Sequence, residues 1–362
     1  MTRNTGLDFI RALAIGLVLM GHVVVMEGWD SDDSFIPDGW IWPTWLVVFI
    51  FLGYAGVEIF FVLSGFLIGR ILINNIENNI SIFNFWWRRW LRTLPTYFLF
   101  LTVNYIIIIY YSWGISLFQI PKYALFIQNL FYPIQQVFFT ESWSLAVEEW
   151  FYLLIPIVLY SFKNTIQRAH VSLIWILSCL ILLFLLIRLF YSMFLNPITD
   201  IYVWNSNLRQ IVVLRMDSLL VGILGSYVAK YHAGIFNKYK SQLGIVGLCF
   251  ITFLTKQFFS LPIEGLYFSV FYPVLFSVFV LLVFPYIMSY RFSQKATHVM
   301  GFISKSSYVV YLSHSPILNL MTYYLSEKVN YPVLLAIPWL FVTFGLSYLI
   351  HIYFEKPIMD LR

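Results

Sequence analysis

Charged residues and cysteines are scarce in this chain. Lys, Arg, Asp and Glu together make up only 11% of the 362 residues. Only two cysteines occur, Cys179 and Cys249, and both lie within apolar runs, which excludes a disulfide framework and a thiolate metal site. No two histidines are three or four residues apart, so no helical histidine pair can bind a metal. The sequence also has no P-loop, no Gly-x-Ser-x-Gly elbow and no dinucleotide fingerprint.

Apolar and aromatic residues are abundant instead, at 60% and 20% of the chain. This composition is far outside the range of soluble domains. At about 33 residues for one span and its connection, the length fits roughly ten transmembrane helices. We therefore predict an all-α integral membrane protein, a bundle of about ten transmembrane helices that forms one domain over residues 1–362, with no appended soluble domain. The predicted spans are 7–27, 45–70, 94–113, 142–161, 171–192, 208–230, 242–259, 266–288, 302–324 and 332–354.

The basic residues indicate the topology. Most Lys and Arg residues fall on the side of the even-numbered connections and of both termini, which predicts that both termini are cytoplasmic. The net charge of +5 is then explained by cytoplasmic loops, and nucleic acid is not expected as a partner. Residues 85–92 resemble an amphipathic helix at the cytoplasmic interface, and residues 122–133 a short segment that does not cross.

Several ionisable residues lie within the predicted spans, and six of them are candidates for buried ion pairs or site residues. Each costs about 2.5 to 3.5 kcal/mol near the bilayer centre, so they must face one another or water. One interpretation is that they form structural ion pairs between helices. Two of them, Arg215 and Asp217, are only two residues apart and point to opposite sides of a helix, so each needs a partner on another helix. The six are Arg11, Glu58, Glu148, Glu149, Arg215 and Asp217.

Arg11 and His22 share the first span. Eleven residues of helix correspond to about 16 Å of rise and about 20° of rotation, so both lie on one face at different depths. An imidazole is a natural general base near neutral pH, although an intramembrane histidine can also be a packing residue. In the fourth span Ser144 and Glu148 share a face, whereas Glu149 points about 100° away. His314 can face the interior with the nearby Tyr311, or simply pack.

Several segments, taken together and in order, resemble the acyltransferase-3 family of membrane O-acyltransferases over nearly the full length. The first is an arginine and a histidine separated by ten residues, here Arg11 and His22. The segments 56–66, 88–95 and 143–153 match further family elements, and weaker matches are 215–217, 308–314 and 355–357.

The resemblance implies an enzyme that moves an acyl group, usually acetyl, from cytoplasmic acyl-CoA to a hydroxyl of a cell-surface glycan or lipid-linked sugar. His22 would be the general base, and Arg11 would stabilise charge on the donor or charge that develops in the reaction. Glu58 and one of Glu148 and Glu149 would orient His22. The acyl-CoA phosphates would be bound by an arginine cluster, for which topology-setting charge or lipid phosphate binding is the alternative. The acyl-CoA-binding residues would be Arg70, Arg88, Arg89, Arg92 and Trp143, and the secondary candidates are Ser64, Ser144, Arg215, Asp217, Tyr311 and His314.

The resemblance also implies a bacterial inner-membrane protein without a metal, in which the pantetheine arm passes Arg11 toward His22 and the acceptor approaches from outside. A polytopic transporter or flippase is the alternative function, although neither inverted repeats nor paired broken helices are evident. The acceptor, the acyl chain length, a homo-oligomer and an acyl-histidine intermediate all stay open.

Overall fold

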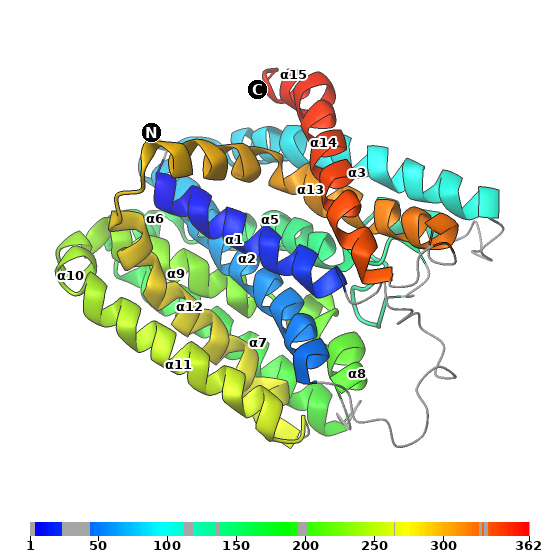
Figure 1. Ribbon diagram of the computed structural model, residues 1–362. Helices are drawn as coiled ribbons and strands as arrows, with labels where there is room; N and C mark the ends of the chain where they lie inside the picture. The colour runs from blue at the N-terminus through cyan, green and yellow to red at the C-terminus, as the bar shows by residue number, and fades with distance from the viewer. Residues whose placement is uncertain are drawn as a thin grey trace.

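The computed structural model describes residues 4–23, 44–111, 119–134, 138–194, 201–263, 265–325, 328 and 332–361. Within these ranges every regular element is a helix (Figure 1). Residues 24–43, which include the acidic residues Glu27, Asp30, Asp32, Asp33 and Asp38, lie outside the described residues.

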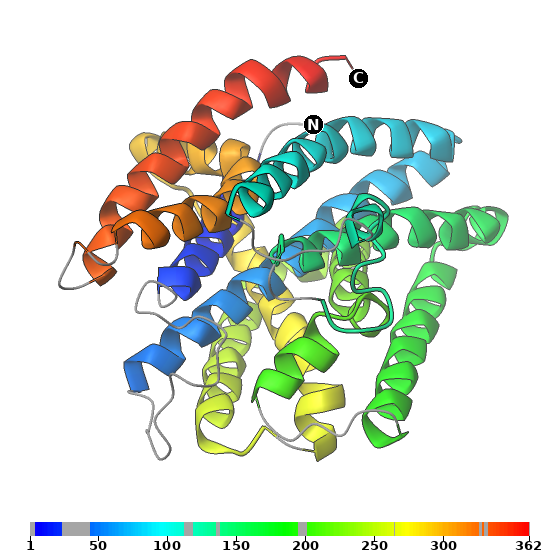
Figure 2. The same cartoon turned by 90° about the vertical axis from the view of Figure 1, so that its right-hand side faces the viewer.

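Two central helices, α1 (Thr5–Val23) and α2 (Thr44–Glu77), pack against each other along the middle of the molecule. On one side of them lie α7 (Ser172–Phe194), α9 (Asp217–Tyr231), α11 (Lys240–Ser260) and α12 (Tyr272–Ser289). On the other side lie α3 (Ile82–Tyr111), α13 (Gln294–Leu325) and α14 (Ala336–Ile350), as Figures 1 and 2 show. α5 (Ser142–Ser161) packs against both α2 and α3.

Short elements connect these helices. The chain passes through α4 (Ile120–Ala124), α6 (Lys163–Arg168), α8 (Ile201–Trp204) and α10 (Ala233–Lys238). It also contains the π-helical turns η4 (Asn205–Arg209), η6 (Tyr267–Phe271) and η9 (His351–Glu355), the 3-10 turns η5 (Val212–Leu214) and η8 (Pro332–Leu335), and the final helix α15 (Lys356–Met359).

Eight helical segments in the described part of the chain are long and apolar enough to cross a membrane. They establish an integral membrane protein of helical architecture. The two remaining predicted spans correspond to α9, which is only 15 residues long, and to α13, which has 32 residues but a more polar composition. The number of ten spans and the cytoplasmic position of both termini stay predictions. The residues nearest the two ends, Asn4 and Met359, line the same cavity and so lie at the same end of the bundle.

The structure corrects two boundaries. α3 is one continuous helix of 30 residues, so the amphipathic segment 85–92 is its first part and not a separate interfacial helix. The sixth predicted span does not begin at Leu208, because residues 210–216 leave the regular helix and α9 begins at Asp217. In this break Val212 and Val213 donate backbone hydrogen bonds to the carbonyls of Asn129 and Leu130, at 2.9 and 3.3 Å. Non-helical backbone is tolerated at such a place because another part of the protein satisfies it.

Small residues permit the close contact between α2 and α9. A Cβ atom added at Gly65 would overlap the backbone carbonyl of Leu219, and one added at Gly222 would lie 2.8 Å from the Cα of Gly65. We expect Gly65→Ala to lower the stability by about 1 to 3 kcal/mol, because the two backbones must separate. Thermal unfolding in detergent measures the loss. Gly16→Ala is the matched control, because its Cβ would meet no atom within 4 Å. Equal unfolding midpoints for the two variants would contradict the prediction.

Candidate active site

A cavity of about 500 Å³ opens between α1, α2, α3, α5 and α13, near the end of the bundle at which α15 lies. We call this the basic cavity, because five cationic side chains line it. Apolar side chains, mostly of α2, form the rest of its wall. The cations are Arg11, Arg70, Arg89, Arg92 and Lys305, and the apolar residues include Val57, Phe60, Phe61, Leu67, Ile68 and Leu145.

Arg89 is the most closely held cation of the cavity. Its Nη2 donates to the hydroxyl of Tyr152 at 2.5 Å and to Oε2 of Glu148 at 3.4 Å, and its guanidinium lies 4.0 Å above the Tyr152 ring. Glu148 also accepts a 2.6 Å hydrogen bond from the hydroxyl of Ser64. Ser64, Arg89 and Glu148 all line the cavity. Tyr152 and Glu148 therefore fix the direction of the Arg89 guanidinium, and Ser64 in turn holds Glu148.

Arg11 enters the same cavity from α1. Its Nη1 donates to the hydroxyl of Ser304 at 3.2 Å, and that hydroxyl donates to Oδ1 of Asp8 at 2.7 Å. The prediction that Arg11 faces the protein interior is thus confirmed. Arg11 thus lies among the basic residues to which, by the family resemblance, the charge of an acyl donor would bind.

Ser144 and Tyr311 also line the cavity. Their hydroxyls are 2.6 Å apart, and Tyr311 also donates to the backbone carbonyl of Glu141 at 3.1 Å. The Tyr311 ring lies 5.6 Å from the ring of His314, which itself does not line the cavity. Ser144 and Glu148 both face the cavity and Glu149 does not, as their spacing predicted.

His22 does not line the cavity, but its ring contacts that of His314, which lies beside Tyr311. Its ring contacts His314 edge-on, with ring centres 4.6 Å apart and an interplanar angle of 82°. Its Nδ1 lies 2.8 Å from the backbone carbonyl of Val18. Since a carbonyl oxygen only accepts, the ring proton is on Nδ1 and Nε2 carries a lone pair. The backbone of its own helix orients this histidine, whereas Glu58 and Glu148, two of the carboxylates expected to do so, bond to other side chains.

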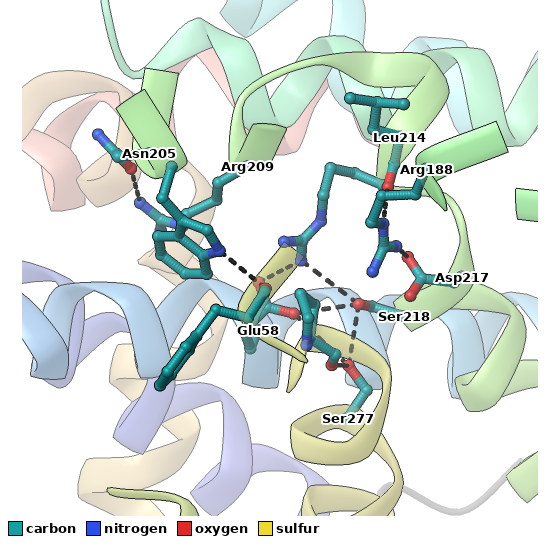
Figure 3. Close-up of polar contacts among 12 residues, drawn as sticks. Glu58, Arg188, Asn205, Arg209, Leu214, Asp217, Ser218 and Ser277 are labelled. Carbon is teal, nitrogen blue, oxygen red and sulfur yellow. Dashed lines mark hydrogen bonds and ion pairs between the residues drawn. The ribbon is translucent and has the colours of Figure 1, made fainter. Parts of the chain in front are cut away.

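Glu58 belongs to a separate buried network, shown in Figure 3. It forms an ion pair with Arg215 and accepts a 3.0 Å hydrogen bond from Ser218. In the same region Asp217 pairs with Arg188 at 2.6 Å. All four charged side chains are fully buried. The prediction that Arg215 and Asp217 each require a partner on another helix is confirmed, and Glu58 is one of those partners and does not orient His22.

Two residues expected to bind acyl-CoA are not in the basic cavity. Arg88 is exposed on α3, on a different side of the helix from Arg89. Trp143 is buried against Phe61, with ring centres 5.9 Å apart. Glu149 of α5 is buried and does not line the cavity either.

The sequence interpretation missed several functional candidates. Arg209, at the start of the sixth predicted span, lies 4.8 Å from the Trp143 ring and 5.2 Å from the Tyr54 ring, with Nη1 donating to Asn205 at 2.8 Å. Lys305 and His351 also line the basic cavity, as does Glu355, which lies in one of the weaker family matches but was given no role. Because partners from distant helices define the positions of Arg209, Lys305 and His351, no spacing in the sequence marked them.

Glu141 is another candidate that the sequence did not reveal. It directly precedes α5, is buried, and its Oε1 contacts no hydrogen-bond donor among the described residues. Burial raises the pKa of this carboxyl to about 7 from its ordinary value of 4.5, against the opposing effect of hydrogen bonds from its own backbone and from Ser315 and Thr140. At neutral pH this side chain is therefore close to its titration midpoint.

The raised pKa of Glu141 gives a stability prediction. Between about pH 4.5 and 7 the folded protein keeps a proton that the unfolded chain loses, so stability falls as the pH rises through this window and levels off above it, by about 3 kcal/mol in total. Glu141→Gln cannot ionise, so we expect the advantage of this variant over the wild type to grow from pH 5 to pH 8. Thermal unfolding in detergent across this range measures the difference. Parallel curves for the two proteins would contradict the assignment.

The fold and the site define a polytopic helical membrane protein with a basic cavity at one end. Among the described side chains, no group of three His, Cys, Asp or Glu residues is arranged to hold a metal ion. The model of the acyltransferase-3 family, described as an acyltransferase domain, matches residues 4–352. The chain belongs to this family.

Two curated relatives are similar over the same part of the chain. Peptidoglycan O-acetyltransferase OatA of Listeria monocytogenes serovar 1/2a is 28% identical over 335 residues, which cover 84% of this chain and 51% of the relative. O-acetyltransferase OatA of Staphylococcus aureus strain NCTC 8325 is also 28% identical over 335 residues, which cover 84% of this chain and 52% of the relative. The chain thus spans about half the length of the curated relatives it matches. No solved structure gives a significant match.

Proposed function

We propose that this protein is a membrane O-acetyltransferase that moves an acetyl group from cytoplasmic acetyl-CoA to a hydroxyl of a cell-wall glycan in the bacterial inner membrane. The family supports acyl transfer, and the two relatives are O-acetyltransferases, one of them acting on peptidoglycan. The observation that carries the donor assignment is the basic cavity.

The cavity suits the donor in charge and in shape. Guanidinium groups bind phosphate oxygens in a bidentate manner, and the four arginines and one lysine of the cavity wall supply that chemistry. The apolar wall of α2 suits the pantetheine arm. The volume of about 500 Å³ falls within the usual range of ligand pockets, roughly 300 to 1,000 Å³.

In the proposed reaction, Nε2 of His22 takes the proton of the acceptor hydroxyl as its oxygen attacks the thioester carbonyl. The tetrahedral intermediate collapses with cleavage of the C–S bond, and the imidazolium returns the proton to the departing thiolate. Arg11 is about 16 Å from His22 along α1, so its role is to bind the donor's charge. Arg209, a cation beside the rings of Trp143 and Tyr54, is the candidate to stabilise the oxyanion.

Sealed vesicles test the vectorial part of this proposal. Labelled acetyl-CoA is enclosed inside, and soluble peptidoglycan fragments are supplied outside in right-side-out vesicles. We expect labelled acetate to appear on the external fragments, and vesicles that contain the His22→Ala variant serve as the control. If no label is transferred while the fragments are acetylated in permeabilised vesicles, the acceptor does not approach from outside.

Arg89 gives a test of donor binding. We expect Arg89→Gln to raise KM for acetyl-CoA by about tenfold to a hundredfold, because a charge-assisted hydrogen bond to the donor is lost. Arg88→Gln is the matched control, since this neighbour carries the same charge on the same helix but does not line the cavity. Steady-state rates at varied acetyl-CoA measure both variants. Equal KM values for them would assign the effect to general surface charge.

A further inference from the structure

The rings of His22 and His314 form a close pair between α1 and α13. Their edge-on contact, with centres 4.6 Å apart, brings together two side chains separated by almost the whole sequence. Of these two imidazoles, the proposed reaction uses only that of His22. The role of His314 is therefore still to be explained.

Both imidazoles are held in the same tautomer. Nδ1 of His22 donates to the carbonyl of Val18 at 2.8 Å, and Nδ1 of His314 donates to the carbonyl of Tyr311 at 2.6 Å. Because each carbonyl can only accept, each neutral ring has a lone pair on Nε2. The pair thus offers two hydrogen-bond acceptors on adjoining rings.

The hydrogen-bonding capacity of Nε2 of His314 is unused. The residue is fully buried, and its Nε2 has no hydrogen-bond partner in the described part of the chain. Buried polar atoms nearly always have partners, and an exception of this kind is typical of a position that a ligand completes.

The surrounding turn of α13 is fixed in place. Trp339 of α14 donates from Nε1 to the carbonyl of His314 at 2.9 Å, and the hydroxyls of Ser313 and Ser347 are 2.9 Å apart. With its own Nδ1 also engaged, the imidazole of His314 cannot readily rotate to find another donor. Its Nε2 is a preorganised acceptor.

We propose that His314 binds the acceptor substrate, by accepting at Nε2 a hydrogen bond from a second donor group that lies next to the reacting hydroxyl. This assignment rests on the proposed function. Two lone pairs on adjoining rings match a substrate with two neighbouring donors, of which one loses its proton to His22 and the other remains bound to His314. Sugars with adjacent hydroxyls, or with a hydroxyl beside an acetamido N–H, have this arrangement.

Two substitutions separate this role from packing. His314→Asn places an amide N–H where Nδ1 lies and so keeps the bond to Tyr311, but it removes the acceptor at the position of Nε2. His314→Gln places its amide oxygen near the position of Nε2. With the vesicle assay and peptidoglycan fragments as the probe, we expect the Asn variant to lose about tenfold or more of kcat, with KM for acetyl-CoA unchanged within about twofold. The Gln variant should keep at least about a third of the wild-type rate.

Trp339→Phe is the control for disturbed packing, because it removes the bond to the His314 carbonyl and leaves the imidazole in place. We expect it to lower the thermal unfolding midpoint more than the transfer rate. Full activity of the Asn variant, or equal losses in the Asn and Gln variants, would overturn the role of His314 while leaving the proposed function intact. An inactive wild-type protein would overturn both.

Discussion

Replacing His22 with alanine is expected to lower acetyl transfer by about 10²- to 10⁴-fold, the usual contribution of general acid–base catalysis. The residue contacts the backbone of its own helix through Nδ1, so Nε2 is the only ring atom left to take the acceptor's proton. Acetate released by mild alkali from the cell-wall glycan measures transfer in cells. His298→Ala is the control, because His298 is exposed at the start of α13. Near-normal acetylation by the His22 variant, at equal amounts of inserted protein, would exclude His22 as the base.

His22→Asn sharpens this test. Its amide N–H can still donate to the carbonyl of Val18, so the local structure of α1 is preserved, whereas the basic nitrogen is lost. If His22 acts as a base, the Asn and Ala variants lose transfer to a similar extent. Full recovery in the Asn variant would indicate instead that the hydrogen bond to Val18 is what matters.

Replacing Glu58 with leucine is expected to reduce stability by about 3 to 5 kcal/mol, because the fully buried Arg215 would lose its carboxylate. Thermal unfolding in detergent, together with the fraction of protein that elutes as a single species, measures the loss. The network in Figure 3 links α2, α9 and α12 through Ser218 and Ser277, so the damage should affect the packing of all three helices.

A double variant distinguishes an unpaired charge from a packing defect. Adding Arg215→Met to Glu58→Leu removes the orphaned cation and leaves an apolar pair of similar size, which is often as stable as a buried ion pair. We expect the double variant to recover most of the lost stability. If it is less stable than the single variant, the two side chains do not interact as the structure indicates.

The sequence predicted the position of a side chain best where the geometry of a single helix determines it. The periodicity of a helix placed Ser144 and Glu148 together in the cavity and turned Glu149 away. It also predicted that buried charges require partners, because the cost of an isolated charge in hydrocarbon is independent of the fold.

The identity of those partners could not be predicted in the same way. Glu58 was expected to orient His22, yet its partner Arg215 is 157 residues away in the chain. The break before Asp217 was also missed, since a hydropathy window averages over it and the backbone bonds that permit it come from Asn129 and Leu130. Neither helix periodicity nor hydropathy could predict the position of Arg209, because the aromatic rings beside it belong to α2 and α5.

His22 is not among the described residues that line the basic cavity. The cavity contains Arg11 together with Ser144 and Tyr311, and the ring of His314 lies 5.6 Å from that of Tyr311. The helix face that Arg11 and His22 share therefore describes only part of the candidate site. Tyr311 comes from α13, which the first span's periodicity cannot reveal.

The irregular backbone before α9 has a consequence for how the chain assembles. Residues 212–213 bind the backbone of residues 129–130, and Asn129 donates to the carbonyls of both Trp143 and Gln210, at 3.0 and 2.6 Å. The ribosome makes the first of these segments well before the second. The carboxy-terminal half of the bundle thus bonds to a segment that is synthesised earlier, and we expect a defect at Asn129 to affect the packing of helices synthesised much later.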